Sequence, residues 1–278
     1  MQMTFVALTI AGSDSGGGAG IQADLKTFQE LGVYGTSALT AVTAQNTLGV
    51  HGVYPLKASE VEKQICAVMD DFPVTAIKTG MLFSVDIIRK VVHTLKHYQA
   101  QALIIDPVMI AKGGASLLQN EAIQALKEEL LPLASIITPN IPEAELLAGM
   151  KITTAHDIER AAEILLETGV DAVVMKGGHL DNQDFAEDLF MSSNGRKFKL
   201  RSERIHTKDT HGTGCTFSAA ITVSMAKGKS MEEAVMIAKD YIHVAIKEGL
   251  HLGNGHGPTN HWAYQSYKGS IKEVVLLD

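Results

Sequence analysis

Short apolar runs alternate with amphipathic stretches of helical length along this chain, and this alternation limits the possible folds more than any other feature. Buried strands are predicted at residues 5–10, 76–78, 102–105, 135–138 and 172–175. Helices are predicted at residues 22–31, 59–72, 85–98, 120–131, 155–168 and 216–226. Strands that alternate with helices favour the doubly wound α/β class, in which helices cover both faces of a mostly parallel sheet.

Local signals add detail to this prediction. Ser59 and Glu62 have the spacing of a capping box at the start of the second helix. Residues 187–191 and 197–201 flank a turn at residues 192–195, which predicts an antiparallel hairpin at one edge of the sheet. Neither a linker nor an internal repeat divides the sequence, so we expect residues 1–278 to form a single domain.

Composition excludes several classes of protein. Hydrophobic residues make up 46% of the chain and charged residues 20%, which excludes a disordered or collagen-like protein. The net charge of −7 disfavours nucleic-acid binding. The two cysteines, Cys66 and Cys215, cannot build a disulfide framework or a four-thiolate zinc site. Because no run reaches the roughly 18 apolar residues of a membrane span and no signal peptide is evident, we expect a cytoplasmic protein that does not bind membranes.

Polar residues and glycines follow the predicted strands. Ligands of parallel sheets bind beyond the carboxyl ends of the strands, where these segments would converge. The segments are residues 12–20, 78–81, 106–108, 140–143 and 176–178. Each segment alone could equally be an ordinary polar loop or part of a functional site, but the common position of all five favours a ligand site.

The first glycine-rich segment matches a dinucleotide-binding pattern only in form. Residues 18–23 fit the pattern, which also requires an acidic residue about 20 positions later to bind a ribose. Residues 31–59 contain no Asp or Glu, which disfavours a Rossmann dehydrogenase. A P-loop is also excluded, because residues 228–230 (GKS) have Val223 where that motif requires glycine.

A second glycine-rich segment, residues 209–220, leads from a loop into a predicted helix. Gly212 and Gly214 would let successive backbone N–H groups point towards one anion, and the helix dipole would add to their effect. Such an anion hole can stabilise the charge on a transferring phosphoryl group. Cys215 would lie at the helix N-terminus, where the pKa of a thiol tends to fall. The alternative is that the glycines only shape the loop and that Cys215 fills space in the core.

The remaining histidines carry weaker signals. His93 and His97 have a spacing that can bind zinc on a helix, but a third ligand is missing, so a solvated helix face is the better interpretation. His251, His256 and His261 lie in a glycine-rich C-terminal segment and are interpreted as loop polarity.

Taken together, the motifs resemble a known family over residues 6–258. They are AGSDSGGGAGIQADLK (11–26), AQNT (44–47), KTGM (78–81), DPVM (106–109), TPNIPEA (138–144), MKGGH (175–179) and THGTGC (210–215). In this order they resemble the bacterial hydroxymethylpyrimidine/phosphomethylpyrimidine kinases of thiamine biosynthesis, members of the ribokinase-like superfamily.

The resemblance implies an ATP-dependent kinase that converts 4-amino-5-hydroxymethyl-2-methylpyrimidine to its monophosphate and then to the diphosphate. The residues implied for the pyrimidine are Gly12, Asp24, Gln45, Met81 and Val108. Those implied for ATP are Asn140, Lys176, Gly178, Thr207 and Thr213. Asp106 and Glu143 would hold Mg²⁺, and the catalytic group would consist of Lys176, Gly212, Gly214 and Cys215. The family likeness also suggests a homodimer.

Cys215 distinguishes this chain from related sugar kinases, which have an aspartate base at this position. A base assists a hydroxyl nucleophile, but the second phosphorylation uses a phosphate that is already anionic and that a carboxylate would repel. We therefore predict that a thiol accommodates both acceptors and that positioning and charge stabilisation supply most of the rate.

Gln45 bears on substrate choice within the fold. Related pyridoxal kinases tend to lack glutamine here, and a primary amide offers the paired donor and acceptor that suit an aminopyrimidine edge. We therefore favour the pyrimidine, with a pyridoxal kinase or a bifunctional enzyme as the alternative. A dehydrogenase and a non-catalytic protein built on a kinase fold are rival classes, and an assay of ATP consumption separates both from a kinase.

Overall fold

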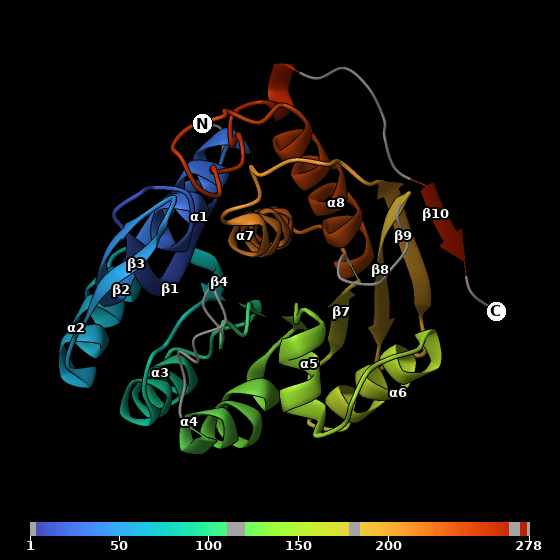
Figure 1. The fold of residues 1–278 in the computed structure, drawn as a ribbon. Coiled ribbons are helices and arrows are strands. Elements are labelled where there is room, and N and C mark those ends of the chain that lie inside the picture. The colour runs from blue at the N-terminus through green and yellow to red at the C-terminus, as the bar shows by residue number, and fades with distance from the viewer. Residues whose placement is uncertain (1–3, 110–119, 178–183, 267–272, 277–278) are drawn as a thin grey trace.

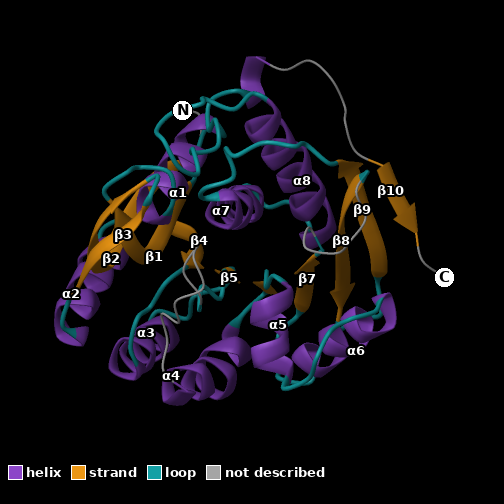
Figure 2. Cartoon of the chain, in the orientation of Figure 1, coloured by secondary structure: helices purple, strands orange, loops and turns teal. Residues whose placement is uncertain are grey.

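A computed structural model describes residues 4–109, 120–177, 184–266 and 273–276, and its strands form one sheet covered by helices on both faces (Figures 1 and 2). The strands are β1 (Val6–Asp14), β2 (Tyr34–Asn46), β3 (Gly49–Pro55), β4 (Val74–Thr79), β5 (Leu103–Ile105), β6 (Ile136–Ile137), β7 (Ala172–Lys176), β8 (Phe185–Ser192), β9 (Lys197–Glu203) and β10 (Glu273–Leu276). The α-helices are α1 (Gly20–Glu30), α2 (Ala58–Met69), α3 (Val85–His97), α4 (Asn120–Ala125), α5 (Ile141–Ala148), α6 (Ala155–Leu166), α7 (Thr213–Ala226) and α8 (Met231–Lys247).

The strand order in the sheet is β10-β9-β8-β7-β6-β5-β4-β1-β2-β3. The six strands β7, β6, β5, β4, β1 and β2 pair in parallel. Antiparallel strands flank them, with β3 beside β2 on one side and β8, β9 and β10 on the other. The predicted α/β class with a mostly parallel sheet is therefore confirmed, whereas a single domain over residues 1–278 stays a prediction.

Alternate residues of the parallel strands supply two separate cores. Ile105 and Ile137 pack towards helices α2 to α6, while their neighbours Ile104 and Ile136 pack towards α7 and α8. Helix α7 packs on the centre of one face of the sheet, and α1 and α8 lie on either side of it (Figure 1). Because α7 is apolar on all sides, its position is determined by packing from several directions.

All five predicted strands and the hairpin are present, but β2, β3 and β10 were not predicted. The apolar residues of β2 are interrupted by Thr, Ser and Gly, and β3 is largely exposed, so neither has the continuous apolar run of the central strands. The hairpin of β8 and β9 is followed by β10, which lies outside it in the sheet.

The predicted helices are present with changes at their ends, and α5 and α8 were not predicted. The capping box of α2 is displaced by two residues from the predicted pair, because the Glu60 side chain accepts a hydrogen bond from the Lys57 N–H at 2.9 Å. The fourth predicted helix is α4 followed by a π-helical turn (Leu126–Leu130) and a 3₁₀ turn (Leu131–Leu133). Pro132 lacks the N–H that a regular helix would require there.

A buried ion pair ties α1 to the sheet. The Lys78 Nζ of β4 lies 2.7 and 2.9 Å from the two carboxylate oxygens of Asp24 on α1. The Thr9 hydroxyl of β1 donates to Asp24 Oδ2 at 2.6 Å. Both charged side chains are fully buried, so the carboxylate has its hydrogen-bond partners inside the protein.

Among the residues that the structure describes, none of the helices is both long enough and apolar enough to be a membrane span.

We expect Lys78→Met to lower the free energy of unfolding by about 3–5 kcal/mol, because the substitution leaves a buried carboxylate without its cation. The matched control is Lys151→Met, which breaks the exposed Lys151–Glu145 pair and should cost about 1 kcal/mol or less. Urea unfolding of both variants measures the difference. Equal losses for the two substitutions would show that the buried pair does not stabilise the fold.

Candidate active site

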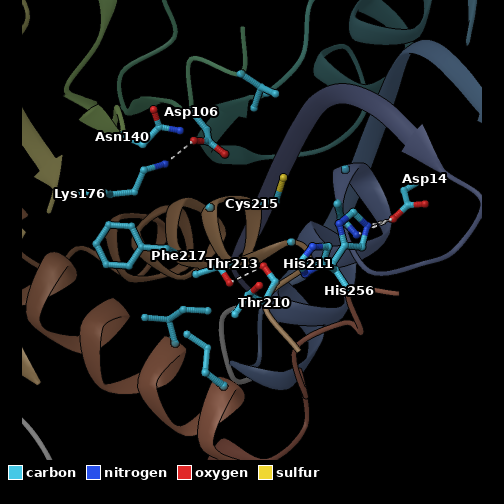
Figure 3. A pocket seen from close by; sticks show the side chains of 18 of the residues that line it. Asp14, Asp106, Asn140, Lys176, Thr210, His211, Thr213, Cys215, Phe217 and His256 are labelled. Atoms are coloured by element: carbon cyan, nitrogen blue, oxygen red, sulfur yellow. Dashed lines mark hydrogen bonds and ion pairs between the residues drawn. The ribbon is translucent and has the colours of Figure 1, made fainter. Parts of the chain in front are cut away.

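One cavity of about 970 Å³ opens beyond the carboxyl ends of the parallel strands. It contains most of the predicted site residues in its wall. They are Gly12, Gln45, Met81, Asp106, Val108, Asn140, Glu143, Lys176, Gly212, Thr213, Gly214 and Cys215. Figure 3 shows Asp106, Asn140 and Lys176 together on one side of Cys215, with Asp14 and His211 on the other.

Asp106 and Lys176 form an ion pair at one end of this cavity. Asp106 directly follows β5 and Lys176 is the last residue of β7, so the parallel sheet brings both to the same edge. Lys176 Nζ lies 3.1 Å from Asp106 Oδ1, while Asp106 Oδ2 is buried and has no hydrogen-bond partner among the residues that the structure describes. Burial alone would raise the pKa of Asp106, but the ammonium groups of Lys176 and Lys78 outweigh it and hold the pKa below its ordinary value.

Glu143 lies beside this pair in the first turn of α5. Its side chain accepts a hydrogen bond from the Asn140 N–H, and the Asn140 side chain accepts one from the Glu143 N–H, each at 2.9 Å. This capping box places both residues at the cavity. Burial raises the pKa of Glu143 to about 7, and the negative charge of Asp106 adds to the rise although Lys176 opposes it.

The two carboxylates fit a Mg²⁺ ion. Asp106 offers an unpartnered buried oxygen, and Glu143 is a buried carboxyl whose charge a nearby cation would stabilise. The described residues contain no group of three or more His, Cys, Asp and Glu side chains that could hold a metal. Magnesium commonly binds one or two carboxylates together with substrate phosphates, which matches this small donor set.

The first turn of α7 faces the same ion pair. The helix begins at Thr213, three residues before the predicted start, so that Gly214 and Cys215 belong to its first turn. A β-carbon on Gly214 would lie 3.2 Å from Lys176 Nζ and 3.5 Å from Asp106 Oδ2, so the backbone there approaches both charged groups. The unpaired N–H groups of a first turn favour an anion at this position.

Gly212 makes this close approach possible. Its φ of +81° lies in the left-handed region, and a β-carbon would stand 1.7 Å from the Gly18 carbonyl oxygen. Any side chain at this position would therefore separate the loop before α7 from the first glycine-rich segment.

Cys215 lies in the cavity wall, but its acidity differs from the sequence prediction. Burial raises the pKa of the thiol to about 12, and the neighbouring Lys78 ammonium only partly opposes this rise. The expectation that the helix N-terminus lowers this pKa is therefore wrong, because desolvation of the thiolate outweighs the helix dipole. The thiol is neutral at physiological pH.

Asp14 and His211 form a contact that sequence reasoning missed. The His211 Nε2 lies 2.8 Å from Asp14 Oδ2. The Asp14 carboxylate also accepts hydrogen bonds from the N–H groups of Gly16, Gly18 and Ala19 at 2.8 to 3.1 Å. Asp14 thus holds the first glycine-rich segment to the loop before α7. An Asp two residues before a glycine run is a signal that could have identified it.

Two predicted site residues do not line the cavity, and a third lies outside the described residues. Asp24 is enclosed in the ion pair with Lys78 and does not line the cavity, and its contact with a pyrimidine stays a prediction. The Thr207 hydroxyl accepts a hydrogen bond from the Asp209 N–H and does not line the cavity, so its place near the nucleotide stays a prediction. Gly178 lies outside the described residues.

Among the C-terminal histidines, His251 is exposed, as loop polarity implies, whereas His256 and His261 have contacts that this expectation did not include. His256 lines the cavity, and His261 is buried with its Nε2 3.1 Å from the Thr216 hydroxyl. Beyond Thr213 the cavity extends between α7, α8 and the hairpin, where sequence reasoning identified no residue. Its wall there contains Phe217, Ile242, Ile246, Asp188, Lys239 and His243. These positions come together only through tertiary packing, and no local motif marks them.

Comparisons with known proteins show which proteins this chain resembles. A sequence model of the family described as phosphomethylpyrimidine kinase matches residues 14–260. The hydroxymethylpyrimidine/phosphomethylpyrimidine kinase of Haemophilus influenzae is 54% identical over 259 residues, which cover 92% of this chain and 96% of that protein. Its counterpart from Bacillus subtilis is 52% identical over 262 residues, covering 94% and 96%. The structure of the pyridoxal kinase from Staphylococcus aureus in complex with AMP-PCP and pyridoxal has a TM-score of 0.91 and 38% identity, covering 99% of this chain and 100% of that chain.

We expect Glu143→Gln to stabilise the metal-free protein increasingly as the pH rises. The pKa of Glu143 is raised from 4.5 to about 7, so between these values the folded protein binds more protons than the unfolded chain. The free energy of unfolding therefore falls as the pH rises through this window, and the amide substitution removes that fall. The variant should gain roughly 1–3 kcal/mol over the wild type above about pH 7, and the gain should shrink towards pH 4.5.

Urea unfolding of both proteins across this range measures the effect. The substitution keeps an acceptor for the Asn140 N–H, so the cap of α5 is preserved. A stability difference that does not change with pH would contradict the raised pKa.

Proposed function

This chain belongs to the phosphomethylpyrimidine kinase family, and from that premise we propose how its residues act in the reaction. It is a phosphotransferase of the ribokinase-like fold that phosphorylates 4-amino-5-hydroxymethyl-2-methylpyrimidine, first to the monophosphate and then to the diphosphate, with ATP as the donor. Activity and fold were both predicted from the sequence motifs, and both are confirmed.

The observation that carries the proposed mechanism is the convergence of Asp106, Lys176 and the first turn of α7 at one end of the cavity. Phosphoryl transfer spreads negative charge over the oxygens of the transferred group, so its rate depends on fixed positive groups placed around them. Lys176 supplies a full charge and the N–H groups of α7 supply partial charges. The transferring phosphoryl group would therefore lie between Lys176 and the segment from Gly212 to Cys215.

The carboxylates of Asp106 and Glu143 would hold Mg²⁺, which would neutralise part of the charge of the phosphates. Asp106 is held ionised by Lys176, so it is ready to bind a cation at neutral pH. Glu143 gains its charge only at higher pH or when a cation is near. Asn140 caps α5 beside them and would donate from its side-chain amide to an ATP phosphate.

The pyrimidine would occupy the part of the cavity near Gln45, with Met81 and Val108 as its apolar walls. The Thr43 hydroxyl donates to Gln45 Oε1 at 3.2 Å, which orients the amide. A β-carbon on Gly12 would lie 2.5 Å from the Met81 methyl group, so a larger residue there would push Met81 into the space of the substrate.

A neutral Cys215 suits an enzyme with two acceptors. At physiological pH the thiol carries no charge, because burial holds its pKa at about 12. It therefore neither removes a proton efficiently from a hydroxyl nor repels an anionic phosphate acceptor. Positioning and charge stabilisation by the surrounding groups would then supply most of the rate in both steps.

Pyridoxal is the second candidate acceptor, favoured by the likeness to the pyridoxal kinase in complex with that ligand. We propose that the pyrimidine is preferred because the Gln45 amide can both donate to and accept from an aminopyrimidine edge. Activity on both substrates is compatible with one shared cavity.

Turnover of the hydroxymethylpyrimidine, its monophosphate and pyridoxal with ATP and Mg²⁺ tests this assignment. We expect kcat/KM to be greatest for the two pyrimidines. Gln45→Leu should lower kcat/KM for the pyrimidines by about 10–100-fold and for pyridoxal by less, because only the pyrimidine edge loses paired hydrogen bonds. A large preference for pyridoxal in the wild type, or equal losses for all three substrates, would contradict it.

Substitution of Cys215 tests the argument from charge. Cys215→Asp should lower the second phosphorylation at least about tenfold more than the first, because a carboxylate repels the phosphate acceptor. Cys215→Ala is the neutral control and should lower both steps to a similar extent. Rates are measured separately with each acceptor at saturating ATP. A Cys215→Asp enzyme that retains the second step would refute the argument.

A further inference from the structure

A buried ion pair in the cavity wall has no part in the mechanism described above. Lys239 Nζ of α8 lies 2.8 Å from Asp188 Oδ2 of β8 and also donates to the Ala186 carbonyl oxygen at 3.1 Å. Both charged side chains are buried, and both line the cavity on the side of the hairpin. Buried pairs often stabilise a fold no better than apolar residues of similar size, so their presence in a cavity wall needs another explanation.

The second oxygen of Asp188 connects this pair to Lys176. Asp188 Oδ1 accepts a hydrogen bond from the Gly177 N–H at 3.1 Å. Gly177 directly follows Lys176, and Lys176 itself pairs with Asp188 in the register of β7 and β8. The Lys176 N–H donates to the Pro139 carbonyl oxygen at 2.9 Å. The backbone is therefore held on both sides at the point where the Lys176 side chain leaves the strand.

The positive charge of Lys239 explains how the Asp188 carboxylate can hold the Gly177 N–H in the wall of a nucleotide site. An unpaired Asp188 would carry negative charge in the wall of a cavity that has to accept phosphates. Lys239 cancels that charge while leaving Asp188 Oδ1 free to accept from Gly177. Because Lys239 belongs to α8, which also contributes Ile242 and Ile246 to the cavity, the pair links that wall to the end of β7.

We propose that Asp188 and Lys239 are a positioning pair, which fixes the Lys176–Gly177 backbone so that the Lys176 ammonium meets the phosphates of ATP. The inference rests on the proposed function, because it assumes that Lys176 contacts the phosphates. Neither member of the pair touches the reacting atoms.

Two double variants separate the hydrogen bond to Gly177 from the charge of the pair. Asp188→Asn with Lys239→Met removes both charges and keeps an acceptor for the Gly177 N–H, whereas Asp188→Leu with Lys239→Met removes the acceptor as well. Calorimetric titration with ATP and Mg²⁺, and separately with adenosine, measures binding without any pyrimidine. The outcome is therefore independent of which acceptor the enzyme phosphorylates.

We expect the Asp188→Leu, Lys239→Met variant to bind ATP about tenfold more weakly than the Asp188→Asn, Lys239→Met variant, because a displaced Lys176 loses its phosphate contact. Adenosine, which has no phosphate, should bind both variants equally. Lys197→Met is the control, since it breaks the ion pair between Lys197 of the same hairpin and Glu159 of α6 and should leave ATP binding unchanged. Equal ATP affinities of the two double variants, or a parallel loss of adenosine binding, would show that the pair only stabilises the fold.

Hydrogen exchange of the Gly177 amide gives a second test that requires no variant. An N–H bonded to a buried carboxylate should exchange slowly in the wild-type protein without ligands. Exchange as fast as in an unfolded chain would overturn the proposal, even if the double variants fail to fold.

Discussion

The contact between the first turn of α7 and the Asp106–Lys176 ion pair is the interaction on which the rest of the site depends. It requires glycine at position 214, where a side chain would crowd both charged groups, and at position 212, where the backbone meets the Gly18 carbonyl. It also requires that α7 be held rigidly, which its burial between the sheet, α1 and α8 ensures. The fold thus presents backbone N–H groups and an ammonium group to the same point in the cavity.

Charge in this site is balanced locally, which explains how a chain with a net charge of −7 can bind a polyanion. Each buried carboxylate that the structure describes near the cavity has a cationic partner or an altered pKa. Asp24 is paired with Lys78 and Asp188 with Lys239, whereas Glu143 has its pKa raised towards neutrality. The unpartnered oxygen of Asp106 and the buried Glu143 carboxyl are the places where a divalent cation would complete the balance.

Much of the fold and of the site could be predicted because the informative residues lie in local patterns. Apolar runs identified the central strands, and the segments that follow them contain Asp106, Asn140 and Lys176. What could not be predicted depends on contacts between distant segments. No sequence pattern indicates that Lys78 encloses Asp24, that Asp14 binds His211, or that desolvation overrides the helix dipole at Cys215. Strand β2 was missed because Thr, Ser and Gly interrupt its apolar residues. Helix α8 begins with a capping box of Ser230 and Glu233, which is a signal that could have indicated it.

The central claim is that the N-terminus of α7 stabilises the transferring phosphoryl group and not simply the bound nucleotide. The most direct measurement compares the affinities of the wild type and of Gly214→Ala for ADP alone and for ADP with aluminium fluoride, which mimics the group in transit. The added methyl group should weaken binding of the mimic at least about tenfold more than binding of ADP, because it separates the N–H groups from Lys176 and Asp106. Equal weakening of both ligands would contradict the account.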